Sequence, residues 1–445
     1  MLIGNLPPKT LVGIDLLSFT SSPNFHGIKD LPAGAHFLYT GTSDSFSLRS
    51  GEWIFIQSSA STSSQSGVGL DIRLRKWDEG LETLVQLDES TDEGKQEAMQ
   101  RRANLGPIWR AGGLLAYRSQ WDGKDIDREG MAETVSPARG DWNCLTNYIS
   151  PAVLDRVLGP RKTAFEQDAR WTITSGSSAA CDKDQIPGLT ATEAAAASGV
   201  AGEQEKNLQF LPIDLKRTWR EGAIGRERTE AARDRSWALG DLIDRFAGEI
   251  QAENDTEATP LEPGEMQCLG EMQLTFLMVL TLMNFSCLEQ WKRLLGIFLT
   301  CHAAIKAREN FFIKMLQLLR VQLSHCNDVE GGLFEMDGDD GGSLLKSLLS
   351  RFRTSVDEVL GEQPSPVKTC LEHLEQWARK EFGWELQKGN IVRRGLLELE
   401  DGELIELDMN GAEEEDESGE YAPVIVNADD SAELYDVDME GLPHG

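Results

Sequence analysis

Histidine and cysteine side chains are the groups best suited to bind a metal or attack a substrate, and the chain has 6 and 7 of them. The histidines form no HxH or HExxH pattern, and the cysteines are never spaced as CxxC. Two adjacent pairs, Cys301-His302 and His325-Cys326, come nearest to a ligand set. Successive residues of a helix point roughly 100° apart, so neither pair forms a bidentate clamp. We interpret both pairs as packing residues.

Glycine-rich and acidic segments give no stronger evidence for a phosphate-binding or calcium-binding site. Gly67-Val68-Gly69 is a glycine turn before an expected strand, and the chain has no GxxxxGK[ST] motif. The segment Asp337–Gly342 resembles the start of a calcium loop, but Leu348 at the twelfth position cannot supply the closing carboxylate. We interpret Glu413–Glu417 as a solvated acidic run. The sequence therefore predicts no catalytic residues, no metal site and no cofactor.

The charge of the chain restricts its partners more than its motifs do. The formal net charge is -31, and residues 395–445 hold 18 Asp and Glu and no Lys or Arg, which leaves -13 for the rest. A chain this acidic repels phosphate backbones and anionic membranes, so we expect neither direct nucleic-acid binding nor membrane binding. Proteins with basic surfaces are the expected partners.

Cysteine usage and hydropathy indicate where the protein works. The seven cysteines are scattered and odd in number, which favours free thiols in a reducing compartment. Residues Met1–Leu11 lack the pattern of a secretory signal, and the most apolar run, Met272–Phe285, is too short to span a bilayer. We therefore expect a monomer located in the cytoplasm and the nucleus.

The spacing of turn residues in residues 1–158 predicts a β-sandwich-like domain with attached helices. Short apolar stretches lie between Gly, Pro and Ser clusters. Trp53-Ile54-Phe55-Ile56 is aromatic and β-branched, which predicts a strand buried on both faces. Residues 159–206 are rich in Ser, Gly and Ala and are predicted to be a flexible linker.

Residues 207–386 show a helical period, which predicts an α-helical bundle or repeat-like domain. Leu274–Phe285 is apolar nearly all round, as the central helix of such a domain would be. The predicted fold is thus α+β and multidomain, with an acidic extended tail over residues 387–445.

A strand-like segment at residues 421–427 stands out from the acidic tail. We predict that it binds a partner through the following residues: Ala422, Pro423, Val424, Ile425 and Val426. An extended peptide of this kind adds to the edge of a partner's sheet and places alternate side chains in pockets. Two other interpretations stay open, namely a strand paired with the chain's own N-terminal sheet and a disordered stretch with chance apolar content.

Runs of residues across the whole chain resemble the A1-cistron splicing factors, which are assembly factors of the U5 small nuclear ribonucleoprotein. The runs that carry the resemblance occur in the family's order: Val12–Phe19, Pro23–Lys29, Leu31–Phe37, Leu145–Ser150, Leu269–Gln273, Glu289–Leu295, Phe382–Trp384 and Ala422–Val426. Residues 159–206 and 327–342 depart from the family pattern.

The resemblance implies a non-enzymatic factor whose partner is the large U5 scaffold protein. Its C-terminal strand would complete a sheet between the RNase-H-like and JAMM/MPN-like domains of that scaffold. The bound factor would block premature association of the U5 helicase and of RNA. The alternative from composition is a general acidic scaffold or chaperone for another basic partner, and a more remote one is a hydrolase whose site residues are dispersed in the sequence.

Overall fold

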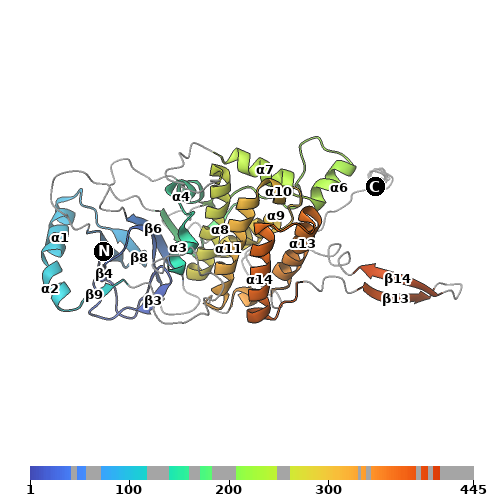
Figure 1. The fold of residues 1–445 in the computed structure, drawn as a ribbon. Coiled ribbons are helices and arrows are strands. Elements are labelled where there is room, and N and C mark those ends of the chain that lie inside the picture. Colours follow the sequence, from blue (N-terminus) through green and yellow to red (C-terminus); the bar gives the residue numbers. More distant parts are fainter. Residues whose placement is uncertain are drawn as a thin grey trace, which may run out of the picture.

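The computed structural model describes residues 1–41, 48–56, 72–117, 140–159, 171–182, 207–247, 261–328, 332–336, 342–386, 392–398 and 404–410. Figure 1 shows a β domain at one end of an elongated molecule, a helical domain in the middle, and a two-stranded hairpin at the other end. The predicted α+β fold, with β and helical domains in that order, is confirmed. Among the described residues, no helix is both long and apolar enough to cross a membrane.

The β domain is a sandwich of two five-stranded sheets. The first sheet has the order β8 (Thr83–Gln86), β7 (Leu74–Asp78), β1 (Leu2–Gly4), β4 (Gly27–Lys29) and β9 (Leu114–Ala116). The second has the order β10 (Trp171–Thr174), β6 (Ser50–Ile56), β5 (Gly34–Gly41), β2 (Leu11–Ile14) and β3 (Leu17–Thr20). Both sheets contribute buried aliphatic side chains to one cluster between them, which includes Ile3 and Ile28 from the first and Val12 and Ile54 from the second.

Strand β6 shows that the second sheet is buried on both of its faces. Ile54 points into the sandwich core, whereas its neighbour Trp53 belongs to the large core that continues into the helical domain. Both side chains are buried, at 1% and 0% exposure. Because successive side chains of a strand point to opposite faces, the second sheet is buried on both sides, as the Trp53–Ile56 run predicts.

Part of the stretch predicted to be a flexible linker belongs to the sandwich instead. Residues 171–182 are described, and there β10 pairs antiparallel with β6, with Trp171 opposite Trp53. Trp171 and Ile173 are buried, and the indole nitrogen of Trp171 donates to Asp155 at 2.8 Å. The prediction is wrong for these residues because this short strand shares the core of the sheet that it joins. The other residues of 159–206 lie outside the described part, apart from Gly159.

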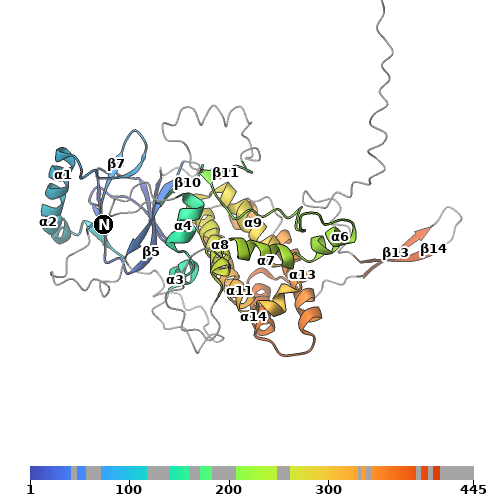
Figure 2. The same ribbon diagram turned by 90° about the horizontal axis from the view of Figure 1, so that it is seen from above.

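In the described part of the chain, four helices accompany the sandwich. Helices α1 (Asp92–Ala103) and α2 (Leu105–Arg110) cover the outer face of the first sheet, where Ala98 packs with Leu2, Leu74 and Leu114. Helices α3 (Asp141–Thr146) and α4 (Pro151–Leu158) lie between the second sheet and the helical domain (Figure 2).

The helical domain follows a two-stranded ribbon of β11 (Ser178–Ala179) and β12 (Asn207–Leu208). Its helices are α6 (Arg226–Arg233), α7 (Ser236–Arg245), α8 (Pro263–Leu282), α9 (Phe285–Phe298), α10 (Ala304–Ala307), α11 (Glu309–Ser324), η2 (Cys326–Asp328), α12 (Leu333–Met336), α13 (Ser343–Leu360) and α14 (Pro366–Phe382). Helix α8 is central, since most of its residues are buried on every side, as its apolar sequence predicts. It begins with a capping box of Glu262 and Glu265 and ends at Met283 in the left-handed region (φ 56°).

One buried carboxylate links two helices of the helical domain to α4 beside the sandwich. Glu271 of α8 is 0% exposed and accepts hydrogen bonds from Arg156 of α4 and from Gln290 of α9, at 2.5 and 2.7 Å. It also accepts from the backbone N–H of Leu211, at 3.0 Å. A buried charge is tolerated only when it is paired and hydrogen-bonded in this way, so Glu271 fixes how α4, α8 and α9 meet.

The tail differs from the prediction at its beginning. Strands β13 (Val392–Glu398) and β14 (Leu404–Asn410) pair antiparallel as a hairpin, which the extended-tail prediction did not include. In the sequence, Asp401-Gly402 lies between two stretches of partly alternating polarity. That dipeptide is a strong hairpin signal, because both residues readily adopt positive φ.

Candidate interaction site

The predicted partner-binding residues Ala422–Val426 lie outside the described residues, so the structure leaves their role as a prediction. What the structure does describe is the point where the tail leaves the helical domain and the surface beside that point.

The tail starts from an aromatic cluster at the end of α14. Gly383 ends the helix in the left-handed region (φ 68°), which turns the chain back so that Trp384 packs against Phe382 and Phe334, with ring centroids 5.0 and 5.7 Å apart. Trp384 and Leu386 are 6% and 4% exposed. The last described residues of the helical domain are therefore anchored beside α12, which carries Phe334.

The hairpin register determines where the rest of the tail begins. Val392 pairs with Asn410, and Glu398 pairs with Leu404. Paired residues of neighbouring strands lie about 5 Å apart, so the chain after Asn410 restarts next to Val392. Val392 follows Leu386 by only six residues. The strand end at Asn410 therefore lies beside Val392.

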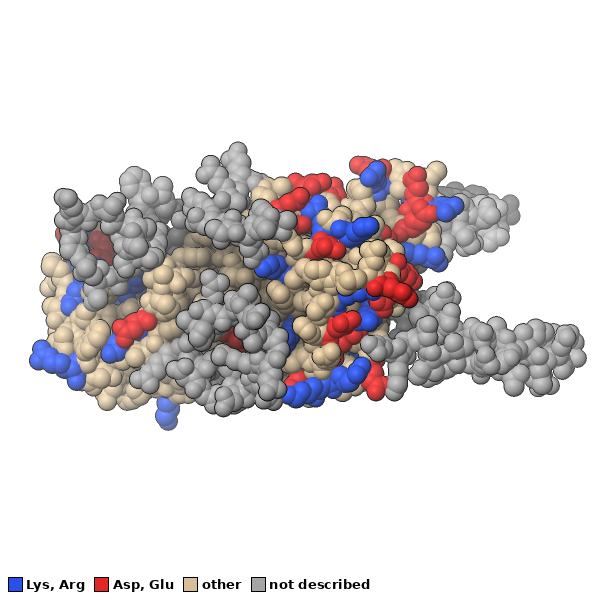
Figure 3. Space-filling view, viewed as in Figure 1, with Lys and Arg blue, Asp and Glu red and all other residues tan. Residues whose placement is uncertain are grey.

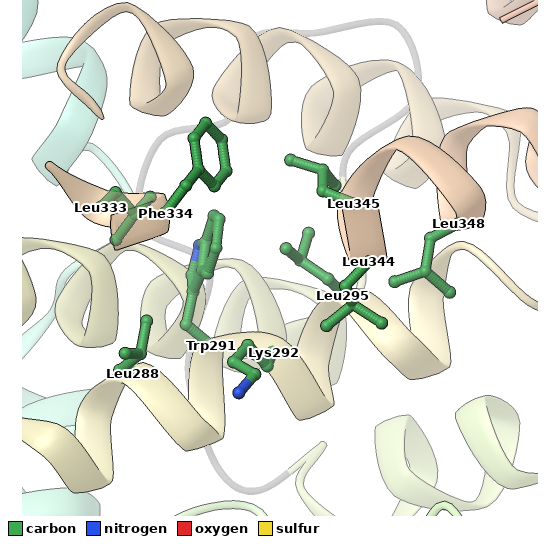
Figure 4. Close-up of a pocket in the computed structure, with 9 residues that line it drawn as sticks. All are labelled: Leu288, Trp291, Lys292, Leu295, Leu333, Phe334, Leu344, Leu345 and Leu348. Carbon is green, nitrogen blue, oxygen red and sulfur yellow. The ribbon is translucent and has the colours of Figure 1, made fainter. Parts of the chain in front are cut away.

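A groove with an apolar lining lies next to this cluster, between α9, α12 and α13 (Figure 4). Figure 4 shows its side chains converging from the three helices, and they are Leu288, Trp291, Lys292, Leu295, Leu333, Phe334, Leu344, Leu345 and Leu348. The groove encloses only about 20 Å³, which is room for one water. Most of its side chains are buried, and Leu344, at 40%, is the most exposed of them, so the groove is a small gap at the edge of the apolar core.

Local sequence places the groove residues on one face of each helix. Helix α9 starts where Asn284 accepts a hydrogen bond from the N–H of Cys287, at 2.9 Å. From that start, Leu288, Trp291 and Leu295 recur at helical spacing and line the groove. On α13, Leu344 and Leu348 are one turn apart, and Leu344 is 40% exposed.

Cations occur at the edge of the groove, although charge on the surrounding surface is mixed. Figure 3 shows Lys, Arg, Asp and Glu interspersed over the visible face of the helical domain. Lys292 lines the groove, with its amine 2.8 Å from Glu289. Arg351 follows Leu344 by seven residues and Leu348 by three, so it lies on the same face of α13. The groove lining is thus apolar except for Lys292, which is paired with Glu289.

The two His-Cys pairs contribute to packing, as the sequence predicts. Cys301 and Cys326 are buried, and burial raises the pKa of the Cys326 thiol to about 12. Burial lowers the pKa of His325, but its contacts with Asp141 and Asp328 outweigh that effect and raise it. Among the residues described, no group of three His, Cys, Asp or Glu side chains could hold a metal ion. Gly67–Gly69 and residues 337–341 of the calcium-like loop lie outside this part of the chain.

A second cavity, of about 260 Å³, lies in the β domain under α2. Leu2, Ile28 and Leu114 form part of its apolar wall. The amine of Lys29 lies 4.2 Å from the ring centre of the half-exposed Trp109 at one side of it. Its lining is mainly aliphatic and is suited to anchoring an apolar group.

Comparison with known proteins identifies the two folded parts separately. Residues 1–159 match the model of the AAR2 N-terminal domain, and residues 210–387 match that of the AAR2 C-terminal repeat region. The two matches together span most of the chain. The chain belongs to the AAR2 family.

Full-length relatives agree with this assignment. The chain is 23% identical over 401 residues to the Homo sapiens protein named Protein AAR2 homolog, covering 86% of this chain and 89% of that protein. It is 24% identical over 396 residues to the Mus musculus protein of the same name, with the same coverage. The family resemblance expected from the sequence is thereby confirmed.

Sequence reasoning missed both the groove and the hairpin. The Leu288–Leu295 stripe is visible in the sequence as an apolar helix face, but the groove beside it depends on how α9, α12 and α13 pack together. The hairpin had a local signal in Asp401-Gly402, which was obscured by the acidic composition around it.

Proposed function

We propose that this AAR2 family member is a non-enzymatic assembly factor of the U5 small nuclear ribonucleoprotein in pre-mRNA splicing. The observation that carries the proposal is the match of both folded parts to AAR2 models in the family's order. The strand-forming composition of Ala422–Val426 also supports it, since an extended apolar stretch suits protein recognition.

The proposed partner is the large U5 scaffold protein. In this proposal Ala422–Val426 adds a strand between the RNase-H-like and JAMM/MPN-like domains of the scaffold, and the body of the factor blocks premature binding of the helicase and RNA. The factor acts as a monomer in the cytoplasm and nucleus. Acidic residues around the strand keep it soluble and guide it toward a basic surface.

Deletion of residues 420–428 tests the strand donation. We expect binding to the two scaffold domains, measured by calorimetry, to weaken at least tenfold, because the strand's ladder hydrogen bonds and apolar contacts are lost. The matched control deletes residues 432–440, which removes a similar length of acidic tail without the apolar stretch. Unchanged affinity after the first deletion would show that the strand does not bind the scaffold.

A salt titration of the same complex separates this function from that of a general acidic chaperone. A chaperone held by bulk charge loses most of its affinity between low and high ionic strength, and loses it equally with either deletion. The assembly factor retains specific binding at high salt as long as the apolar stretch is present.

A further inference from the structure

The cavity under α2 has the size and the lining of a binding site. Its volume is about 260 Å³. That exceeds the roughly 150 Å³ of an engineered cavity that binds benzene, and it lies just below the roughly 300 Å³ at which pockets for drug-sized ligands begin. The cavity therefore fits one bulky side chain better than a cofactor. Helix α2 lies at the end of the molecule away from the helical domain (Figure 1), so the cavity is separate from the groove beside α9.

One wall of the cavity is made of paired strands. Leu2 of β1 donates its N–H to the carbonyl oxygen of Arg73 at 2.8 Å, where β1 begins to pair with β7. On its other side β1 pairs with β4, and β4 pairs with β9. The wall residues Leu2, Ile28 and Leu114 come from β1, β4 and β9 and are 5%, 0% and 8% exposed. Such a wall cannot move inward without breaking hydrogen bonds of the sheet, so the cavity is preformed.

The opposite wall is α2, which is tied to the sheet at its end. Gly113 donates its N–H to the carbonyl oxygen of Ile108 at 3.0 Å, and its own carbonyl oxygen accepts from the N–H of His26 at 2.8 Å. A Cβ at position 113 would lie 2.8 Å from the His26 ring, so a larger residue would push the ring or the helix away. Leu105 and Trp109 are one helical turn apart, and both line the cavity. The helix is thus held at a fixed place over the sheet with these two side chains at the cavity.

The mouth of the cavity combines an exposed aromatic ring with positive charge. Trp109 is 44% exposed, and the amine of Lys29 lies 4.2 Å from its ring centre. A cation at this distance from an indole ring is attracted to it, which orients both side chains. Arg73 also lines the cavity and donates to the carbonyl oxygen of Phe55 at 2.8 Å. Of the charged side chains in the described lining, two are cationic and one, Asp30, is acidic, a net charge of +1 on a chain whose formal net charge is -31.

This combination selects a ligand that carries an apolar group next to a negative charge. The leucine, isoleucine and tryptophan side chains of the lining favour an apolar group, because burying it removes apolar surface from water. The net positive charge favours a carboxylate beside that group and disfavours an amine. Tryptophan is also among the residue types that contribute most to protein–protein binding. Because Trp109 lies at the surface, a chain that inserts one side chain beside it can continue past the mouth.

We propose that the cavity under α2 is a docking site for a partner protein, which inserts one aromatic or long aliphatic side chain from an acidic segment. A neighbouring carboxylate of that segment pairs with Lys29, and the inserted side chain packs between Ile28 and Trp109. The site lies in the β domain and does not involve Ala422–Val426. It therefore goes beyond the proposed function and assumes neither the scaffold nor splicing.

A fluorinated peptide tests the docking on the full-length protein. The probe is the amide of acetyl-Glu-Phe-Glu-Gly with fluorine on the phenylalanine ring, and its fluorine resonance is followed by nuclear magnetic resonance at low ionic strength. We expect a saturable shift of this resonance. Binding should be at least about tenfold weaker when both glutamates of the probe are replaced by lysine, because the charge that faces the lining is then reversed. Equal affinity for the two peptides would mean that the partner segment is not acidic and would overturn the proposal.

Two variants assign the binding to the cavity. Lys29→Gln should reduce the difference between the two peptides to about threefold or less, since one of the two cations is removed. Trp109→Ala should weaken binding of the acidic peptide by about tenfold. The matched controls are Lys95→Gln and Met99→Ala on α1, which change side chains that are 56% and 67% exposed, and both should bind like the wild type. Melting followed by circular dichroism checks that the four variants are folded.

Three further results would overturn the proposal. The first is the absence of a saturable shift, which would mean that the cavity accepts no side chain from a peptide. The second is equal binding by the wild type, Lys29→Gln and Trp109→Ala, which would place the peptide elsewhere on the protein. The third is binding of free fluorophenylpropionate without binding of the peptide, which would assign the cavity to a small carboxylate instead of a partner protein.

Discussion

The start and the middle of α9 face opposite kinds of surroundings. At its start, the side-chain amide of the fully buried Asn284 donates to the carbonyl oxygens of Thr174 and Ser177, at 2.9 and 2.8 Å, and so joins the helical domain to the sandwich. Two to three turns later, Trp291 and Leu295 are 4% and 2% exposed and pack in the apolar core of the helical domain. The first contact depends on directional hydrogen bonds between domains, whereas the second depends on apolar packing within one domain. A single helix thus joins the two domains at its start and packs the helical domain along its middle.

The largest expected effect comes from the polar network around Glu271. Glu271→Ala removes the carboxylate that pairs with Arg156 and leaves the buried N–H of Leu211 without its acceptor, which should lower the free energy of unfolding by about 3–5 kcal/mol. Urea denaturation followed by circular dichroism measures it. Glu227→Ala on the exposed face of α6 is the control and should change stability by less than about 0.5 kcal/mol. A loss below about 1 kcal/mol for Glu271→Ala would mean that the network does not hold the helices together.

Asn284→Ala should cost about 2–3 kcal/mol, since it removes the cap of α9 and leaves carbonyl oxygens of the sandwich without donors. Asn284→Asp separates the two roles, because the carboxylate keeps the cap but cannot donate to Thr174 and Ser177. If the contact between the two domains depends on the hydrogen bonds that the Asn284 amide donates, Asn284→Asp is also destabilising in urea denaturation. Wild-type stability for Asn284→Asp would reduce Asn284 to an ordinary helix cap.

The sandwich carries a buried histidine that should make stability depend on pH. His36 lies 2.7 Å from Asp15 and 2.9 Å from the carbonyl oxygen of Pro32. Burial by itself lowers the pKa of His36, but these contacts outweigh that effect and raise it. A raised pKa stabilises the fold below the pKa of the unfolded chain, near 6.5, and this contribution is lost as pH rises through the folded value.

We therefore expect the free energy of unfolding to fall between about pH 6 and pH 8, and His36→Gln to flatten that fall. Some slope should persist, because the pKa of His325 is shifted in the same direction. Tyr117→Phe is the matched control, since it removes the hydrogen bond that the Tyr117 hydroxyl donates to Asp15, at 2.6 Å, without removing the histidine. An identical pH profile for His36→Gln and the wild type would exclude a charged His36.

The smallest expected effect is at the start of α13. Leu344→Ala should lower stability by less than about 0.5 kcal/mol, because Leu344 is 40% exposed. Its neighbour Leu345 is 4% exposed, and Leu345→Ala should cost about 2–5 kcal/mol. Similar losses for both variants in thermal denaturation would mean that Leu344 belongs to the core rather than to the surface.

Sequence patterns predicted the elements whose burial is uniform along them. Trp53–Ile56 and Leu274–Leu282 are apolar on every side, so their place in the core follows from composition alone. Residues 171–182 and the groove could not be predicted in this way. The strand at Trp171 depends on pairing with a strand more than 100 residues earlier. The groove depends on how three helices that are separate in the sequence pack against one another. Both are properties of tertiary packing.

The most direct test of the account replaces Val424, Ile425 and Val426 together by serine in the full-length protein. The account predicts an unchanged free energy of unfolding and at least tenfold weaker binding to the paired RNase-H-like and JAMM/MPN-like domains, measured by calorimetry. Unchanged affinity for those domains would contradict it.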